Sequence, residues 1–189
     1  MQPAARAPLA SNGADLGSAF EVTAARGRRV PIWSDTDFLA AVRSGDFKAT
    51  PWRPDDLTPN GLDLRIGHVL VVGQMEAPQD SGTVTIPPGA RFAIGTQEYL
   101  EMPAAAVGSL WIRSSYARRG VLASFGKVDA GFHGNLTVGC FNASHESLAI
   151  AIGDRFCQIV LEDLKSPPQA AYAQKSGNYQ GQRGVTLSK

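Results

Sequence analysis

The chain has 189 residues, a formal net charge of +1 at pH 7 and 43% hydrophobic residues. This length predicts one domain with a buried core. The balanced charge argues against a basic surface that binds a nucleic acid polymer. No apolar run approaches the length of a membrane span, and no basic-then-apolar signal pattern opens the chain, so we expect a cytoplasmic protein that does not bind a membrane.

The two ends of the chain differ in composition from its middle. Residues 1–29 are rich in Ala, Gly and Ser and show little hydrophobic periodicity. Such a segment buries too little apolar surface to offset the entropy of ordering it, so we expect a flexible N-terminal extension. The folded domain is expected over residues 30–172, followed by a flexible, Gly-containing tail over residues 173–189.

A short helix is the first ordered element that the sequence predicts. Ser34, or the Asp that follows it, can cap the N-terminus of this helix. Phe38, Leu39 and Val42 then fall on one helical face, and Gly45 ends the helix. Several prolines after this helix force an extended, irregular path.

The next segment, residues 60–67 (NGLDLRIG), predicts the start of a strand. Leu62, Leu64 and Ile66 share one face, while Asp63 points to the other.

Further short strands are predicted downstream, among them residues 83–86, 91–96 and 136–142. Gly and Pro turns separate them, as in the tight turn PPGA before residue 91. Many short strands with only one clear helix indicate an all-β barrel or sandwich.

The stretch between residues 110 and 142 carries most of the reactive side chains. Within seven residues it holds two serines and three arginines, namely Arg113, Ser114, Ser115, Arg118 and Arg119. Guanidinium groups and hydroxyls suit an anion, because Arg offers a planar fork of donors to phosphate oxygens. The carboxylate of Asp129, in VDAGFHG, could hold a water or a sugar hydroxyl. A surface hairpin with scattered charge is the alternative that composition allows.

RSSYARRG followed by VDAGFHG resembles the joint signature of the dUTPase and dCTP deaminase superfamily. Its members carry an RSS or RSG-x-A segment and then a G-x-I-D-x-G segment that ends in an aromatic residue and Gly. The resemblance extends from about residue 32 to residue 184. It implies an all-β, dUTPase-like β-barrel or β-clip jelly roll with a short N-terminal helix. It also implies a homotrimer with active sites between subunits.

The resemblance further implies a deoxypyrimidine triphosphate as substrate and magnesium (Mg2+) as cofactor. Asp63 would help to position the magnesium on the triphosphate, although a strand-edge salt bridge is the alternative role for this carboxylate. The residues that would face the phosphates are Ser114, Ser115, Arg118 and Gln158. Arg113 would either reach a phosphate or brace the site.

The same resemblance assigns roles on the nucleoside side. Asp129 would orient and deprotonate the attacking water, and Phe132 would stack under the deoxyribose, although a core Phe gives the same sequence pattern. The tail SGNYQGQRG resembles a deaminase tail that folds over the nucleotide, and Tyr179 and Gln182 match its motif.

One departure from the family pattern bears on the activity. The dCTP deaminases carry a Glu three residues before the Asn of this strand, and that Glu moves protons between water and the base. Here Gly139 holds its place before Asn142. Glycine cannot transfer a proton, but it leaves room and lets the backbone approach a base closely. We therefore expect hydrolysis of dUTP to dUMP and diphosphate.

Three alternatives stay open at this stage. A dCTP deaminase would need another acid, and Glu146 falls after the strand in what reads as a turn. A non-catalytic nucleotide-binding regulator could also lack the Glu, although the presence of Asp129 counts against it. A triphosphatase for a modified pyrimidine would exploit the room at Gly139.

The histidines and cysteines argue against a zinc deaminase, because His68, His133, His145 and the two cysteines show no metal-ligand spacing. Cys140 and Cys157 lie in apolar runs and are predicted to be buried free thiols of a reducing compartment.

Overall fold

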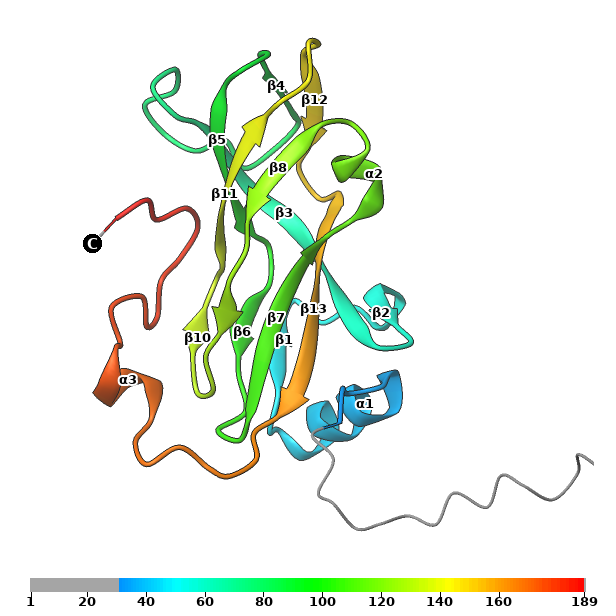
Figure 1. Ribbon diagram of the computed structural model, residues 1–189, viewed down its shortest axis with the longest axis vertical. Coiled ribbons are helices and arrows are strands. Elements are labelled where there is room, and N and C mark those ends of the chain that lie inside the picture. Colours follow the sequence, from blue (N-terminus) through cyan, green and yellow to red (C-terminus); the bar gives the residue numbers. More distant parts are fainter. Residues whose placement is uncertain (1–30, 189) are drawn as a thin grey trace, which may run out of the picture.

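The computed structural model describes residues 31–188. The predicted N-terminal extension, residues 1–29, lies outside them. Strands make up most of the fold, with α1 (Asp35–Ser44) at one end and the C-terminal segment along one side (Figure 1).

The remaining helical elements are short: the 3-10 turn η1 (Pro54–Asp56), α2 (Ser114–Ala117) and α3 (Tyr172–Lys175). The strands are β1 (Lys48–Thr50), β2 (Leu57–Thr58), β3 (Gly61–Val71), β4 (Thr83–Ile86), β5 (Arg91–Thr96), β6 (Tyr99–Glu101), β7 (Ala106–Ile112), β8 (Val121–Ser124), β9 (Lys127–Val128), β10 (His133–Gly134), β11 (Thr137–Asn142), β12 (Leu148–Ala151) and β13 (Arg155–Asp163).

The strands form one large sheet and two small ones, all paired antiparallel. The large sheet has the order β8-β11-β5-β3-β13-β7-β9, and β2 pairs with β3 beside this path. The small sheets are β1-β6-β10 and β12-β4. In Figure 1 the large sheet curls on itself and the helices stay at its margins. The predicted all-β fold with a short N-terminal helix is confirmed.

Strand β3 is the centre of the core, because β5 and β13 flank it on either side. Leu64 and Ile66 are fully buried, as the alternation predicts. The face opposite these side chains is also covered: Asp63 is only 2% exposed. The alternation in β3 therefore separates an apolar interior from a buried ionic layer, and not from solvent.

Helix α1 follows its local signals. The Ser34 side chain accepts from the backbone N–H of Asp37, and the Asp37 side chain accepts in return, so both members of a capping box are present. Gly45 ends the helix in the left-handed conformation, which glycine adopts at little cost. Phe38 is fully buried and packs edge-on against Phe47. The predicted helix is confirmed.

The Arg-rich stretch forms the short helix α2, and not the surface hairpin that was the alternative prediction. The Arg113 carbonyl accepts from the N–H groups of Tyr116 and Ala117, which closes one helical turn. Tyr116 is buried and packs edge-on against Phe156 of β13. Burial also raises the pKa of Tyr116 to about 12, so its hydroxyl stays neutral.

Within residues 31–188, no helix combines the length and the apolar character that crossing a membrane requires. Both cysteines are buried and free, as predicted. Burial raises the pKa of Cys140 to about 12, which makes its thiol unreactive.

Removing the helix cap should weaken α1. We expect Ser34→Ala to lower the free energy of unfolding by about 1 kcal/mol, because the Asp37 N–H loses its acceptor. Urea unfolding followed by circular dichroism measures the loss. Thr36→Ala changes an exposed side chain of the same turn and is the control. Equal losses in the two variants would contradict the capping role.

Candidate functional site

Apart from Arg118, the predicted site residues fall into two pockets of the chain. The first, called the Asp129 pocket below, has a volume of about 460 Å³ and holds Asp129, Phe132, Gly139, Tyr179 and Gln182. The second, called the Arg113 pocket, has a volume of about 310 Å³ and holds Asp63, Arg113, Ser114, Ser115 and Gln158. The two pockets share no lining residue.

Strand β7 borders both pockets. Leu110 lines the Asp129 pocket, whereas the next two residues, Trp111 and Ile112, line the Arg113 pocket. The two pockets therefore lie at successive positions along β7.

A tight turn holds Asp129 at its pocket. Phe132 donates its N–H to the Asp129 carbonyl at 3.1 Å, and Gly131 inside this turn has φ +75°. Only glycine adopts that conformation readily, which gives the Gly of the VDAGFHG segment a physical reason. The Asp129 carboxylate is exposed, whereas Phe132 is buried and meets the Tyr172 ring edge-on at 5.6 Å.

Gly139 lies in β11 opposite Ser124 of β8 and Ala93 of β5. A Cβ atom built on Gly139 meets nothing within 4 Å, so packing does not demand a glycine here. Among the described residues that line this pocket, Asp129 is the only carboxylic acid. Glu146 is exposed in the turn after β11 and does not line the pocket.

The C-terminal segment forms another wall of the Asp129 pocket. Gln182 is buried, and its Nε2 donates to the Asn135 carbonyl at 2.5 Å. Its Oε1 is also buried but has no hydrogen-bond partner within residues 31–188. A buried acceptor without a partner is costly, so a donor on a bound molecule would stabilise it.

In the Arg113 pocket, Arg113 forms an ion pair with the buried carboxylate of Asp63. Arg155 lies 3.8 Å from the same carboxylate. Of the two roles left open for Arg113, this contact supports the bracing one, and it gives Asp63 the salt bridge that was its alternative role. The Gln158 side chain donates to the Thr58 hydroxyl at 2.6 Å.

The exposed serines of this pocket, Ser114 and Ser115, lie in the single turn of α2. Arg118 follows that turn, and its backbone N–H donates to the Ser114 carbonyl at 2.9 Å. The exposed Arg118 side chain lines neither pocket.

No group of three or more His, Cys, Asp or Glu side chains within residues 31–188 could hold a metal ion. Asp63, the one carboxylate of the Arg113 pocket, is already paired with a guanidinium. The side chains of residues 31–188 therefore do not fit a protein-held magnesium ion. Magnesium as a partner of the triphosphate remains a prediction and belongs to the substrate.

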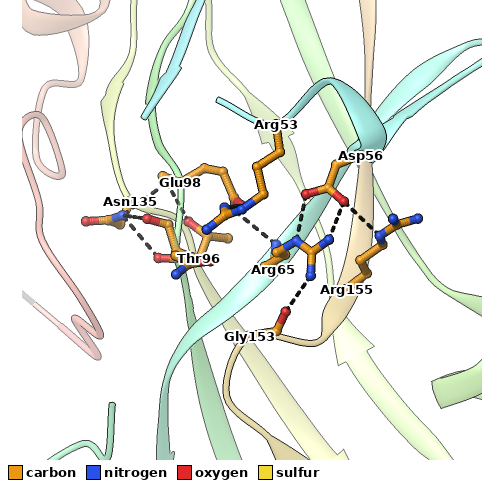
Figure 2. A network of polar contacts seen from close by, with 9 residues as sticks. Arg53, Asp56, Arg65, Thr96, Glu98, Asn135, Gly153 and Arg155 are labelled. Atoms are coloured by element: carbon orange, nitrogen blue, oxygen red, sulfur yellow. Dashed lines mark hydrogen bonds and ion pairs between the residues drawn. The ribbon is translucent and has the colours of Figure 1, made fainter. Parts of the chain in front are cut away.

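A buried ionic network lies behind β3 (Figure 2). Asp56 accepts two hydrogen bonds from the Arg65 guanidinium, at 2.7 and 2.6 Å, and pairs with Arg155 Nε at 2.7 Å. Burial by itself raises the pKa of Asp56, but the hydrogen bond and charge of Arg65, together with Arg155 and Arg53, lower this pKa below its ordinary value.

Glu98 is the second acid of this network. Its carboxylate accepts the Arg65 backbone N–H at 2.9 Å and lies 3.6 Å from Arg53. Burial raises the pKa of Glu98, and the Arg65 N–H offsets only part of that shift. Asp56, Tyr172 and Asn135 could not be assigned a role from the sequence, because each acquires contacts from segments distant in the chain.

Comparison with known proteins identifies the class to which this fold belongs. The structure of 2'-deoxycytidine 5'-triphosphate deaminase from Agrobacterium tumefaciens superposes with a TM-score of 0.62 at 21% identity. The match covers 72% of this chain and 49% of that chain, so this chain spans about half of that protein. The fold is that of the dUTPase and dCTP deaminase superfamily, as the sequence predicted.

The family follows from the sequence matches. The dCTP deaminase-like family matches residues 32–164. The dCTP deaminase of Thermococcus kodakarensis is 42% identical over 140 residues, covering 74% of this chain and 88% of that protein. The dCTP deaminase of Aeropyrum pernix is 35% identical over 174 residues, covering 84% and 96%. The chain belongs to the dCTP deaminase-like family, whose relatives are enzymes of nucleotide metabolism.

The two buried acids should respond to pH with opposite signs. The raised pKa of Glu98 means that its contribution to stability is present below about pH 4.5 and is lost as the pH rises through the folded pKa. We expect Glu98→Gln to gain stability relative to the wild type, by about 1 kcal/mol between pH 4 and pH 7. Urea unfolding at several pH values measures this difference.

Asp56→Asn is the matched comparison. In the wild type, the pKa of the Asp56 carboxyl is lowered, so this group contributes stability above about pH 3.8. That contribution is lost only as the pH falls through the pKa of the folded state. This variant should lose about 3 kcal/mol at neutral pH, because two guanidinium groups remain without their carboxylate. If the stability difference from the wild type changed with pH in the same direction for both variants, the opposite pKa shifts of Glu98 and Asp56 would be refuted.

Proposed function

We propose that the protein hydrolyses a deoxypyrimidine triphosphate, dUTP, to dUMP and diphosphate. The observation that carries this proposal is the pair Asp129 and Gly139 in one pocket. An acid that can activate water is present, while the place of the deaminase Glu is glycine. No other carboxylate among the described residues lines this pocket, so the acid that would carry protons to and from a base is missing.

In the proposed mechanism, the exposed Asp129 carboxylate orients a water and accepts its proton during in-line attack on the α-phosphorus. The bond between the α-phosphorus and the bridging oxygen breaks, and diphosphate leaves. Ser114, Arg118 and Gln158 offset the negative charge that develops on the phosphate oxygens. Phe132 and the C-terminal wall hold the nucleoside, so most of the catalytic effect is positioning.

The proposal requires two subunits for one site. Asp129 and the nucleoside-side residues lie in one pocket, whereas Ser114 and Gln158 line another that shares no residue with it. A homotrimer, which the family resemblance implies, would place the Arg113 pocket and Arg118 of one subunit against the Asp129 pocket of the next. Trp111 at the Arg113 pocket is 62% exposed, and a large exposed aromatic residue is typical of an interface.

Deamination of dCTP is the second candidate, and the names of the relatives favour it. The Thermococcus kodakarensis protein called dCTP deaminase is 42% identical over 88% of its length. In this reaction water attacks C4 of the base and ammonia leaves, which requires a proton for the leaving amino group. Asp129 would be the available acid in the pocket, or the partner subunit would supply one.

A product assay distinguishes the two reactions. Purified protein with magnesium is given dUTP, dCTP, dTTP and UTP separately, and diphosphate and ammonia are measured in the same tubes. We expect diphosphate from dUTP and no ammonia from dCTP. Asp129→Asn should lower kcat at least about 100-fold while nucleotide binding persists, because the water loses its base.

Asp80→Asn is the control, since Asp80 is exposed and lines neither pocket. Ammonia from dCTP would overturn the hydrolase proposal in favour of the deaminase. Nucleotide binding without either product would contradict both enzymatic proposals and favour a non-catalytic nucleotide-binding regulator.

Mixing two inactive variants tests whether the site lies between subunits. Asp129→Asn and Arg118→Ala alter different halves, so each alone should be inactive. Co-expressed in equal amounts, they should recover about a quarter of wild-type activity, since that share of sites receives both intact halves. Activity no higher than the sum of the separate variants would place the whole site within one subunit.

A further inference from the structure

The C-terminal segment, residues 176–188, lies along β10 and β11 and is held there by backbone contacts. Gly181 donates its N–H to the His133 carbonyl at 2.7 Å, and Gln182 pairs with Gly134 in a parallel bridge. Farther along, Thr186 donates its N–H to the Thr137 hydroxyl at 3.0 Å. The segment is therefore docked through one isolated β-bridge and the flanking hydrogen bonds, beside the pocket that holds Asp129.

Asn135 is at the centre of this docking. It is 7% exposed, and its Nδ2 donates to the carbonyls of Thr96 and Glu98 at 3.1 and 3.0 Å. Its Oδ1 accepts the N–H of Gly184 at 3.3 Å. One side chain thus joins the turn between β5 and β6 to the C-terminal segment. Figure 2 shows the contacts of Asn135 with Thr96 and Glu98.

The Asn135 backbone fixes the side chain and the main chain of Gln182. Its N–H donates to the Gln182 carbonyl at 3.0 Å, and its carbonyl accepts from Gln182 Nε2 at 2.5 Å. Because Nε2 is committed to this bond, Gln182 presents Oε1, the buried atom without a partner among the described residues. The docking therefore fixes the orientation of the Gln182 amide in the wall of the Asp129 pocket.

Two glycines show how closely the segment passes over the sheet. A Cβ atom on Gly95 of β5 would lie 2.8 Å from the Gly184 carbonyl oxygen. A Cβ atom on Gly134 would lie 3.2 Å from Gln182 Cγ. Since any side chain there displaces the segment, the β5 and β10 surface is shaped to receive it.

The anchor itself is rigid. The Glu98 carboxylate accepts the Arg65 N–H, and the Arg65 guanidinium is held by Asp56 and by the Gly153 carbonyl at 2.9 Å. The carbonyls that receive the Asn135 amide therefore belong to a buried region that is held by hydrogen bonds and ion pairs (Figure 2). A side chain bonded to such a region transmits its position to the segment with little freedom.

We propose that Asn135 is a positioning residue, which docks the C-terminal segment and fixes Gln182 in the wall of the pocket that receives the nucleotide. The docking follows from the contacts of this chain alone, whereas the effect on the nucleotide rests on the proposed function. Asn135 touches no substrate in this scheme and acts through Gln182. Its loss should therefore raise KM more than it lowers kcat.

The chain offers a matched control in Asn142, at the other end of β11. Asn142 is fully buried, and its Nδ2 also donates to three carbonyls, those of Ile86, Pro87 and Glu146. None of its contacts involves the C-terminal segment. Asn135→Ala and Asn142→Ala should both lower the Tm, whereas only the first should release the segment.

Limited trypsin digestion of the full chain gives a readout that needs no turnover. Lys175 and Arg183 are exposed cleavage sites in or beside the segment, and the Arg183 guanidinium stacks over Tyr99 at 3.8 Å. Intact-mass analysis should show cleavage at these sites about tenfold faster in Asn135→Ala than in the wild type or Asn142→Ala. The KM for the nucleotide should rise by about tenfold in the same variant.

Thr137→Val is a second variant in case Asn135→Ala folds poorly. It removes the hydroxyl that accepts the Thr186 N–H and keeps a β-branched side chain in β11. Faster cleavage after Lys175 and Arg183 in this variant supports the docking as well. If Asn135→Ala and Thr137→Val both keep wild-type cleavage and KM, the proposal is overturned. If cleavage accelerates while no variant and no wild type turns over a nucleotide, the docking stands and the proposed function fails.

Discussion

The pairing of buried carboxylates with arginines is the constraint on which the rest of this structure depends. Asp56 and Asp63 are each 2% exposed, and between them they engage Arg65, Arg155 and Arg113. Removing these charges from water is costly, so each must keep its partner. Because the partners come from β3, β13 and the residue before α2, the pairing fixes these elements in one arrangement. The Arg113 pocket is a consequence of that arrangement.

The same network reaches the other pocket through Glu98. Its carboxylate holds the Arg65 backbone, and its own carbonyl accepts from Asn135, which holds the C-terminal segment. The ion pairs of the Arg113 pocket and the C-terminal wall of the Asp129 pocket therefore share one buried framework. This continuity gives a physical reason why the two pockets, though they share no lining residue, keep a fixed relation to each other.

Elements set by neighbours in sequence could be predicted. Helix α1 carries its own cap and stop, and the strand over residues 137–142 alternates as its burial does. Helix α2 could not be predicted, because its turn is stabilised by Tyr116 packing on Phe156 far along the chain. The division of the predicted site residues between two pockets could not be predicted either, because it depends on how strands distant in the chain are ordered in the sheet. Asn135 acquires its role only once the segment that follows α3 returns to β10.

Gly139 is the point where folding and chemistry can be separated. Glycine inside a strand destabilises a protein by about 0.5–1 kcal/mol relative to alanine. At many glycines this cost is explained by a left-handed backbone or by a close neighbour, as at Gly131 and Gly95. Neither applies to Gly139, since its φ is not positive and a Cβ atom there meets nothing within 4 Å. The fold of the described residues therefore does not require glycine at this place. Gly139 and the Asp129 carboxylate line the same pocket, and the proposed hydrolysis rests on that pairing of open space with a single acid.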